Sequence, residues 1–336
     1  MKNSKNNGVI KYTKSLLQTF AFPIFMWVFF AILIELKVEN NIFVSAASFQ
    51  DIFQTSTTSV IIAIAVALPL SGGRWDFGPG AIMVVTSIVA GNLAIEHNMG
   101  IGMLLVLSVV IAVGLALFEG SIYLIFKVPT MIVSLGIVML YEAISGLIYD
   151  GSGVRLFMYE DLSILARQPY CYIITAIVLL GFWILMKYTK FGYDSRSLGN
   201  NAALSINNGV NEKKNIMLTY LVVGILLGIA SLMNASKAVV APQSNLGSTF
   251  LMFSSMGAVL VGLYLARFSN MALGILSGTI AMTILSKGLT VYGMPSSLNN
   301  IILGVFIVVF MGYTTNVEIM KEYVSRIRRK KAKLAN

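Results

Sequence analysis

Long apolar stretches, separated by short polar connections, recur along almost the whole chain. A helix needs about 20 mostly apolar residues to cross the hydrocarbon core of a membrane. Ten runs approach that length: 16–35, 52–70, 78–95, 100–118, 129–148, 170–186, 216–234, 249–266, 271–287 and 298–313. The pattern predicts an all-α integral membrane protein with about ten transmembrane helices.

The run 52–70 has the least apolar character at its start. Its uninterrupted apolar stretch is shortened by polar residues: Asp51, Gln54 and the Ser/Thr cluster at 55–59. Irregular backbone at membrane depth must be buried in protein or face water. We therefore expect this segment to be broken or to line a wet path.

Composition favours a membrane protein over a soluble globular one. Hydrophobic residues make up 57% of the chain and charged residues 11%, with a mean hydropathy of +0.82. Soluble domains usually carry about 25% charged residues. The first apolar run is longer than that of a secretory signal and lacks a clear small-residue cleavage site, so we interpret it as a retained span.

The net charge of +10 is concentrated in three segments: 1–15, 187–214 and 317–336. Basic segments that flank apolar runs mark the cytoplasmic side, and an even number of spans places both termini there. We expect a basic cytoplasmic N-terminus (1–15), one transmembrane domain (16–316) with a cytoplasmic loop (187–214), and a basic cytoplasmic tail (317–336). Attraction to anionic membrane lipids explains the tail without a nucleic-acid partner.

The sequence lacks the motifs of common enzymes. No Gly-Lys dipeptide occurs, so the phosphate-binding loop of nucleotide hydrolases is absent, as are G-x-S-x-G and H-E-x-x-H. The single cysteine, Cys171, excludes an internal disulfide and a Cys-based metal cluster, and His97 is the only histidine. We expect no catalytic residue, no metal and no cofactor.

Two acidic residues lie within or beside apolar runs, where charge is costly. Glu119 either lines a solute path, pairs with a basic side chain, or marks a helix end. Asp76 lies in SGGRWDFGPG, where Gly72, Gly73 and the following Gly-Pro-Gly interrupt any helix. This turn is a candidate gate or solute contact; the alternative is a capped loop with Asp76 at a helix N-terminus. Separately, Gly224–Gly228 and Gly274–Gly278 have a spacing that favours close helix packing.

Four segments, in order, resemble permease subunits of binding-protein-dependent ABC importers of the ribose/xylose/simple-sugar type. They are SGGRWDFGPGAIM (71–83), EGSIYLIFKVPTMIVSLG (119–136), FGYDSRSLGNNAALSINNGVNEKK (191–214) and the last third of the chain, with YGMPSSLNNIILG (292–304). The third segment is the most specific. Arg74-Trp75 and Glu119 depart from the family pattern, which affects the expected substrate more than the family.

The resemblance implies that seven residues of the third segment form a cytoplasmic coupling helix that contacts an ATP-binding subunit: Leu198, Gly199, Asn200, Asn201, Ala202, Ala203 and Gly209. Local chemistry agrees, since Asn-Asn-Ala-Ala is typical of a short helix start and Asn-Asn-Gly at 207–209 of its end.

The family further implies a multi-pass protein of a bacterial-type cytoplasmic membrane. Its partners would be ATP-binding cassette subunits, an extracytoplasmic solute-binding protein and a second permease copy or paralogue. A monosaccharide is the expected solute. The alternatives are a self-sufficient secondary carrier driven by an ion gradient, and a permease for a nucleoside or another non-sugar solute.

Overall fold

The computed structural model describes residues 2–37, 41–126, 128–295, 298–314 and 316. Its long helices are α1 (Lys2–Glu35), α2 (Ala46–Ser71), α3 (Gly78–Glu96), α4 (Ile101–Phe126), α5 (Thr130–Leu147), α7 (Tyr170–Tyr188), α8 (Lys190–Asn200), α10 (Glu212–Ala235), α11 (Thr249–Leu265) and α12 (Met271–Val291). Two short helices, α6 (Glu160–Ser163) and α9 (Ala202–Asn207), lie in connections, and an apolar helix, Leu298–Thr314, follows α12. The predicted tail 317–336 lies outside the described residues.

All ten predicted apolar runs are helical, which confirms the all-α membrane architecture. In the described part of the chain, eight helices are long and apolar enough to cross a membrane, and Thr249–Leu265 and Leu298–Thr314 are shorter. The run 52–70 is not broken, contrary to one expectation. It belongs to the continuous helix α2, whose polar start is tied down because Ser45 accepts a hydrogen bond from the Ser48 amide at 3.2 Å. The basic segment at the N-terminus continues into α1 as one helix.

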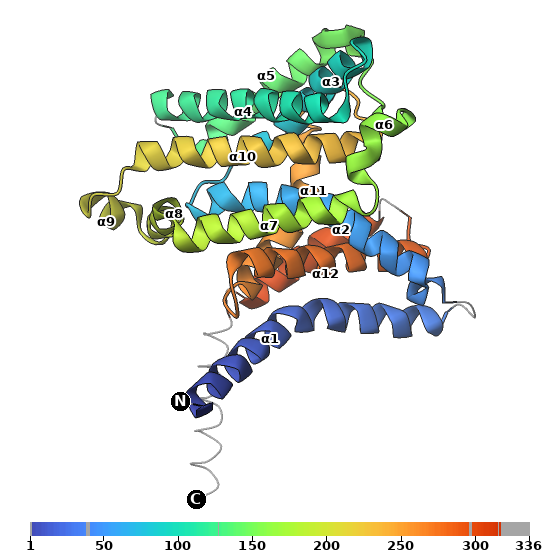
Figure 1. The fold of residues 1–336 in the computed structure, drawn as a ribbon, viewed down its shortest axis with the longest axis vertical. Helices are drawn as coiled ribbons and strands as arrows, with labels where there is room; N and C mark the ends of the chain where they lie inside the picture. The colour runs from blue at the N-terminus through green and yellow to red at the C-terminus, as the bar shows by residue number, and fades with distance from the viewer. Residues whose placement is uncertain (1, 38–40, 127, 296–297, 315, 317–336) are drawn as a thin grey trace, which may run out of the picture.

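Helix α2 lies in the middle of the bundle (Figure 1) and contacts α3, α7, α8, α10, α11 and α12. On one side of it, α10 packs along α4 beside α3 and α5; on the other, α12 packs between α1 and α11. Residues Val60 to Leu68 of α2 are buried without interruption. A helix that is apolar all round is typical of the centre of a multi-helix bundle.

The two predicted small-residue motifs lie at close contacts between helix backbones. A side chain at Gly224 or Gly228 of α10 would overlap with the backbone of Val113 or Val109 in α4. Gly274 and Gly278 of α12 make the same close approach to α11. Backbone contact of this kind replaces the hydrophobic effect, which does not drive helices together in lipid.

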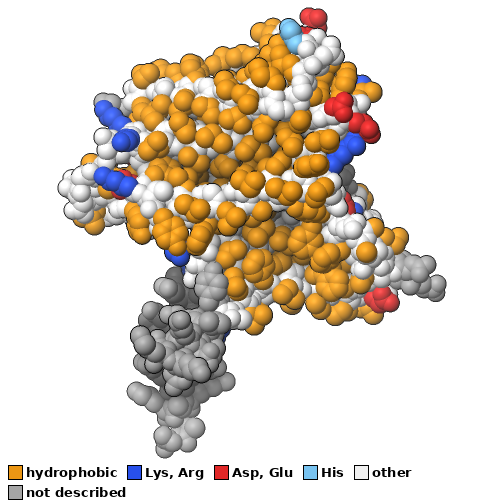
Figure 2. Space-filling model, viewed as in Figure 1, with side chains coloured by type: hydrophobic (Ala, Val, Ile, Leu, Met, Phe, Trp, Pro, Cys, Tyr) orange, Lys and Arg blue, Asp and Glu red, His pale blue; other side chains and the backbone are white. Residues whose placement is uncertain are grey.

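The two ends of the bundle differ in charge. Figure 2 shows a broad apolar surface between them, with basic side chains gathered at the end that carries α8 and α9. The visible acidic side chains lie mainly at the opposite end, near α6. We call the former the α8–α9 end; by charge, it is the end expected in the cytoplasm.

Candidate functional site

The candidate coupling segment begins with α8, directly after α7. The hydroxyl of Thr189 accepts a hydrogen bond from the Gly192 amide at 3.3 Å and so caps the first turn of α8. The helix buries Ser195 and Leu198 against the bundle and contacts α2 and α10. Because α8 is held on two sides, its far end has a fixed position.

A second helix, α9, follows after a break at Asn201. The extended backbone of Asn201 ends α8. The side-chain oxygen of Asn201 accepts a hydrogen bond from the Leu204 amide at 3.0 Å and so caps the start of α9. Gly209 ends the segment with φ +87°, in the left-handed region that favours glycine. The predicted start and end of a short helix are thus confirmed, but the prediction of one helix is wrong. Leu198, Gly199 and Asn200 end α8, whereas Ala202 and Ala203 begin α9.

Helix α9 projects from the bundle (Figure 1). Leu204 is 58% exposed and Ile206 43% exposed, and Ala202 and Ala203 are exposed beside them. The helix is fixed to α8 because the hydroxyls of Ser197 and Ser205 lie 2.6 Å apart. Exposed apolar side chains on a rigid short helix at a charged end are typical of a contact surface for another protein.

The end of α8 meets the glycine-rich turn that follows α2. A side chain at Gly199 would overlap with the carbonyl oxygen of Ser71, and the α-carbon of Gly199 lies beside Gly73. The structure therefore brings together residues from two separate predictions: the coupling residue Gly199 and the possible gate residues Gly72 and Gly73.

Arg74 extends this contact into the interior. The side chain is 5% exposed, and one terminal nitrogen donates to Asn215 Oδ1 at 3.2 Å and to Thr219 Oγ1 at 3.3 Å. The Asn215 amide in turn donates to Ser195 Oγ of α8 at 2.9 Å. Burial lowers the pKa of the Arg74 guanidinium from its ordinary value. The turn, α8 and α10 are thus joined by one buried polar network.

Asp76 caps the first amide of α3 from the position before the N-cap, which is Phe77 and not Asp76 as one sequence interpretation predicted. Its Oδ1 accepts from the Gly78 amide at 2.8 Å, and Oδ2 has no hydrogen-bond partner among the described residues. Burial raises the pKa of this carboxyl, which is 7% exposed. The capping role accounts for the position of Asp76 and leaves one of its oxygens unpaired.

Glu119 lies directly beside that cap. It is fully buried inside α4, which continues to Phe126, so it does not mark a helix end. A side chain at Gly78 would overlap with its carboxylate, and its carboxyl lies within hydrogen-bonding reach of Asp76. Neither carboxylate oxygen of Glu119 has a hydrogen-bond partner among the described residues. Glu119 also belongs to neither of the two ion pairs in that part of the chain. Arg74 faces this pair, but no ion pair in the described part of the chain joins it to either carboxyl, so two buried carboxyl groups in contact favour a proton held between them.

A cavity of about 340 Å³ lies between α2, α11, α12 and the helix Leu298–Thr314. Its lining is rich in hydroxyl groups, with Asp51 and Lys287, which form an ion pair, at one edge. The hydroxyl residues are Thr55 and Ser59 of α2, Ser254 and Ser255 of α11, and Thr279, Thr283, Ser286 and Thr290 of α12.

Several of these hydroxyls already donate to the backbone of their own helix. Thr283 donates to the Thr279 carbonyl at 2.9 Å, Thr290 to Ser286 at 2.9 Å and Ser59 to Thr55 at 3.3 Å. Their oxygen lone pairs remain free to accept hydrogen bonds. The polar start of the run 52–70, which the sequence predicted to be broken or to line a wet path, lines this cavity. Sequence reasoning missed the contribution of α12, although its hydroxyl residues recur at spacings of 4, 3 and 4, which places them on one helix face.

Residues 48–311 match the family described as branched-chain amino acid transport system / permease component. The match covers more than half of the chain, which therefore belongs to this family. The protein is a transport subunit that crosses the cytoplasmic membrane several times, and the resemblance found in the sequence is confirmed.

The chain is similar to three characterised permeases in particular. It is 24% identical over 307 residues to the galactose/methyl galactoside import permease protein MglC of Haemophilus influenzae, covering 84% of this chain and 91% of the relative. It is 26% identical over 267 residues to the galactofuranose transporter permease protein YtfT of Escherichia coli, covering 76% of each. Identity to the ribose import permease protein RbsC of Escherichia coli is 24% over 277 residues, 80% of this chain and 83% of the relative. No solved structure matches the chain.

Proposed function

We propose that this chain is the permease of an ATP-driven importer and moves a monosaccharide across the cytoplasmic membrane. The observation that carries the choice of solute is the hydroxyl-lined cavity between α2, α11 and α12. Sugar hydroxyls both donate and accept hydrogen bonds, and the free lone pairs of Thr283 and Thr290 are suited to accept from them. A volume of about 340 Å³ lies in the range of small-ligand sites.

The family description names branched-chain amino acids, while the relatives MglC, YtfT and RbsC are named for sugars. A branched-chain amino acid needs an apolar surface for its side chain. The cavity has such a surface at Ile52, Phe250, Met282 and Leu303, but hydroxyls from three helices also line it. Its two charged residues, Asp51 and Lys287, neutralise each other and leave no unpaired charge in the lining for an amino or carboxylate group. The lining therefore favours a sugar.

Movement of the solute is driven by partner subunits in this proposal. ATP-binding cassette subunits bind the exposed surface of α9 and push α8 against the turn 71–76. Because Gly199 lies against Ser71, a rigid-body shift of α8 moves this turn directly. A solute-binding protein delivers the sugar at the opposite end, and a second permease copy or paralogue completes the pathway. Residues Gly72, Gly73, Asp76 and Glu119 form the gate region.

The test uses proteoliposomes that contain the chain with or without an ATP-binding subunit and a solute-binding protein. We expect uptake of radiolabelled monosaccharide only when both partners and ATP are present. Ala202→Glu or Ala203→Glu, which places a charge on α9, should abolish both uptake and sugar-stimulated ATP hydrolysis. Accumulation by the chain alone under an ion gradient would instead establish a secondary carrier.

A further inference from the structure

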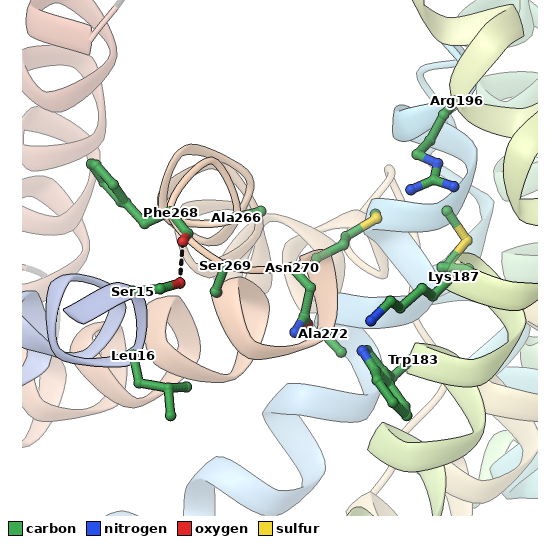
Figure 3. Close-up of a pocket in the computed structure, with 12 residues that line it drawn as sticks. Ser15, Leu16, Trp183, Lys187, Arg196, Ala266, Phe268, Ser269, Asn270 and Ala272 are labelled. Carbon is green, nitrogen blue, oxygen red and sulfur yellow. Dashed lines mark hydrogen bonds between the residues drawn. The ribbon is translucent and has the colours of Figure 1, made fainter. Parts of the chain in front are cut away.

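A second cavity, of about 600 Å³, opens at the α8–α9 end and is unrelated to the hydroxyl-lined cavity. Figure 3 shows that it lies between Ser15 and Leu16 of α1, the end of α7, α8 and the turn from α11 to α12. The Ser15 hydroxyl donates to the Phe268 carbonyl and closes its α1 side. None of the described residues that line it is acidic.

Two cations face this cavity from the same side. Figure 3 shows Lys187 of α7 and Arg196 of α8 directed toward the α11–α12 turn. The two ion pairs in the described part of the chain are Arg167–Glu160 and Lys287–Asp51, so neither cation has a carboxylate partner. Lys187 lies over the ring of Trp183 at 5.0 Å, and Arg196 over that of Tyr193 at 4.9 Å. The aromatic contacts orient both cations without neutralising their charge.

The opposite wall adds hydrogen-bond donors. Met271 and Ala272 are the first residues of α12, whose first-turn amides lack partners within the helix and carry a partial positive charge. Asn270 uses its Oδ1 to accept from Leu273 at 2.9 Å. Arg196 Nε donates to the Gly192 carbonyl at 3.2 Å, which leaves its charge uncompensated. Two cations without carboxylate partners, opposite a long helix's N-terminus, form a site for an anion with several oxygens, such as a phosphate group.

An apolar pocket continues from this cationic site. It has a volume of about 230 Å³, is lined by Leu179, Leu180 and Leu273, and shares Trp183, Asn270 and Ala272 with the first cavity. The adjoining surface of α7 is apolar and exposed, with Ile177 64% and Ile184 50% exposed. A soluble phosphate makes no favourable contact with an apolar surface, whereas the acyl chain of a lipid beside a membrane helix would pack against it.

We propose that this is a binding site for an anionic glycerophospholipid of the leaflet at the α8–α9 end. Lys187 and Arg196 bind the phosphate-bearing headgroup, and the pocket at Leu179, Leu180 and Leu273 holds an acyl chain. Because Arg196 belongs to α8, the bound lipid links α8 to the α11–α12 turn. Lipid binding does not depend on the nature of the transported solute.

The experiment is native mass spectrometry of the full chain with phosphatidylglycerol or phosphatidylcholine. We expect selective retention of phosphatidylglycerol, and at least a tenfold loss of its affinity in Lys187→Gln/Arg196→Gln, since each cation near a membrane surface contributes about fivefold. The charge-matched control is Lys190→Gln/Lys213→Gln, which removes two exposed cations of the same end that lie outside the cavity. Equal loss in both double variants, or no loss in either, would overturn the site.

Two further experiments distinguish a lipid from soluble phosphate and locate the bound lipid on the chain. Inorganic phosphate at millimolar concentration should not displace the lipid; full displacement would show a soluble-phosphate site instead. A photoactivatable phosphatidylglycerol added to the unmodified chain should crosslink to residues 179–196 and 265–273. Labelling confined to other segments would contradict the proposal even if the double variant failed to fold.

Discussion

The α-carbon of Gly199, near the end of α8, lies against the carbonyl group of Ser71, the last residue of α2. No side chain fits between them, so the two helices touch through their backbones. A contact without flexible side chains transmits displacement with little loss. In the proposed coupling, this contact connects α8, and through it the exposed helix α9, to the turn that precedes α3.

Replacing Gly199 with alanine should force these backbones apart. Overpacking of a close contact costs about 1–3 kcal/mol, so we expect a lower midpoint of thermal unfolding in detergent for Gly199→Ala. Gly102→Ala is the matched control, because a side chain there meets no atom within 4 Å. Equal unfolding midpoints for the two variants would contradict the close contact.

A charge on α9 should affect assembly and leave the fold intact. Leu204 is 58% exposed, so the new carboxylate of Leu204→Glu remains in contact with water and should leave the unfolding midpoint unchanged. If α9 is the contact surface, the affinity for the ATP-binding subunit should fall at least tenfold, since the interface would then bury an unpaired carboxylate.

The control for this measurement is Met158→Glu. Met158 is 66% exposed and lies near α6, at the opposite end of the bundle. Binding of the ATP-binding subunit, measured by pull-down from nanodiscs, should be unaffected in this variant. Equal binding of the Leu204 and Met158 variants would show that the ATP-binding subunit does not bind at α9.

The carboxyl pair of Asp76 and Glu119 predicts a pH dependence of stability. A buried acid with a raised pKa holds its proton in the folded state after the unfolded chain has lost it. Stability should therefore fall as pH rises from the unfolded value of Asp76, 3.8, toward its folded pKa. The other titratable groups facing the pair are Arg74, Tyr141 and Tyr220.

Glu119→Gln tests this directly, because the amide donates to the unpaired Asp76 oxygen without needing a shared proton. We expect the unfolding midpoint of the variant to fall less than that of the unmodified chain as the pH rises above 3.8, the unfolded pKa of Asp76. Glu96→Gln removes an exposed carboxyl and should keep the original pH dependence. Identical profiles for the Glu119 variant and the unmodified chain would show that the pair does not share a proton.

Features set by a few neighbouring residues could be predicted from the sequence. Asn201 and Gly209 bound α9 because capping and a left-handed turn depend on local chemistry alone. The glycine pairs of α10 and α12 were predicted as packing sites for the same reason: their spacing fixes one helix face.

Features that combine distant segments could not be predicted. Nothing near Arg74 in the sequence indicates Asn215 as its partner, and the meeting of Gly199 with Ser71 depends on the packing of α8 against α2. The hydroxyl groups of α12 were visible, but Ser and Thr in helices commonly bond to the preceding turn. Only the packing of α2 and α11 against that face turns them into a cavity lining.

The cavity gives the last prediction. Thr283→Val keeps the shape of the side chain but removes an oxygen that faces the cavity. A buried polar site that loses one hydrogen bond to its ligand loses about 0.5–1.5 kcal/mol, so the half-saturation concentration for monosaccharide uptake should rise about 2- to 12-fold. Thr86→Val is the isosteric control, because the buried Thr86 hydroxyl has no hydrogen-bond partner among the described residues and lies on α3, away from the cavity. Uptake by reconstituted importer checks both variants; an unchanged Thr283 variant would exclude this cavity from the solute path, while the α9 results would be unaffected.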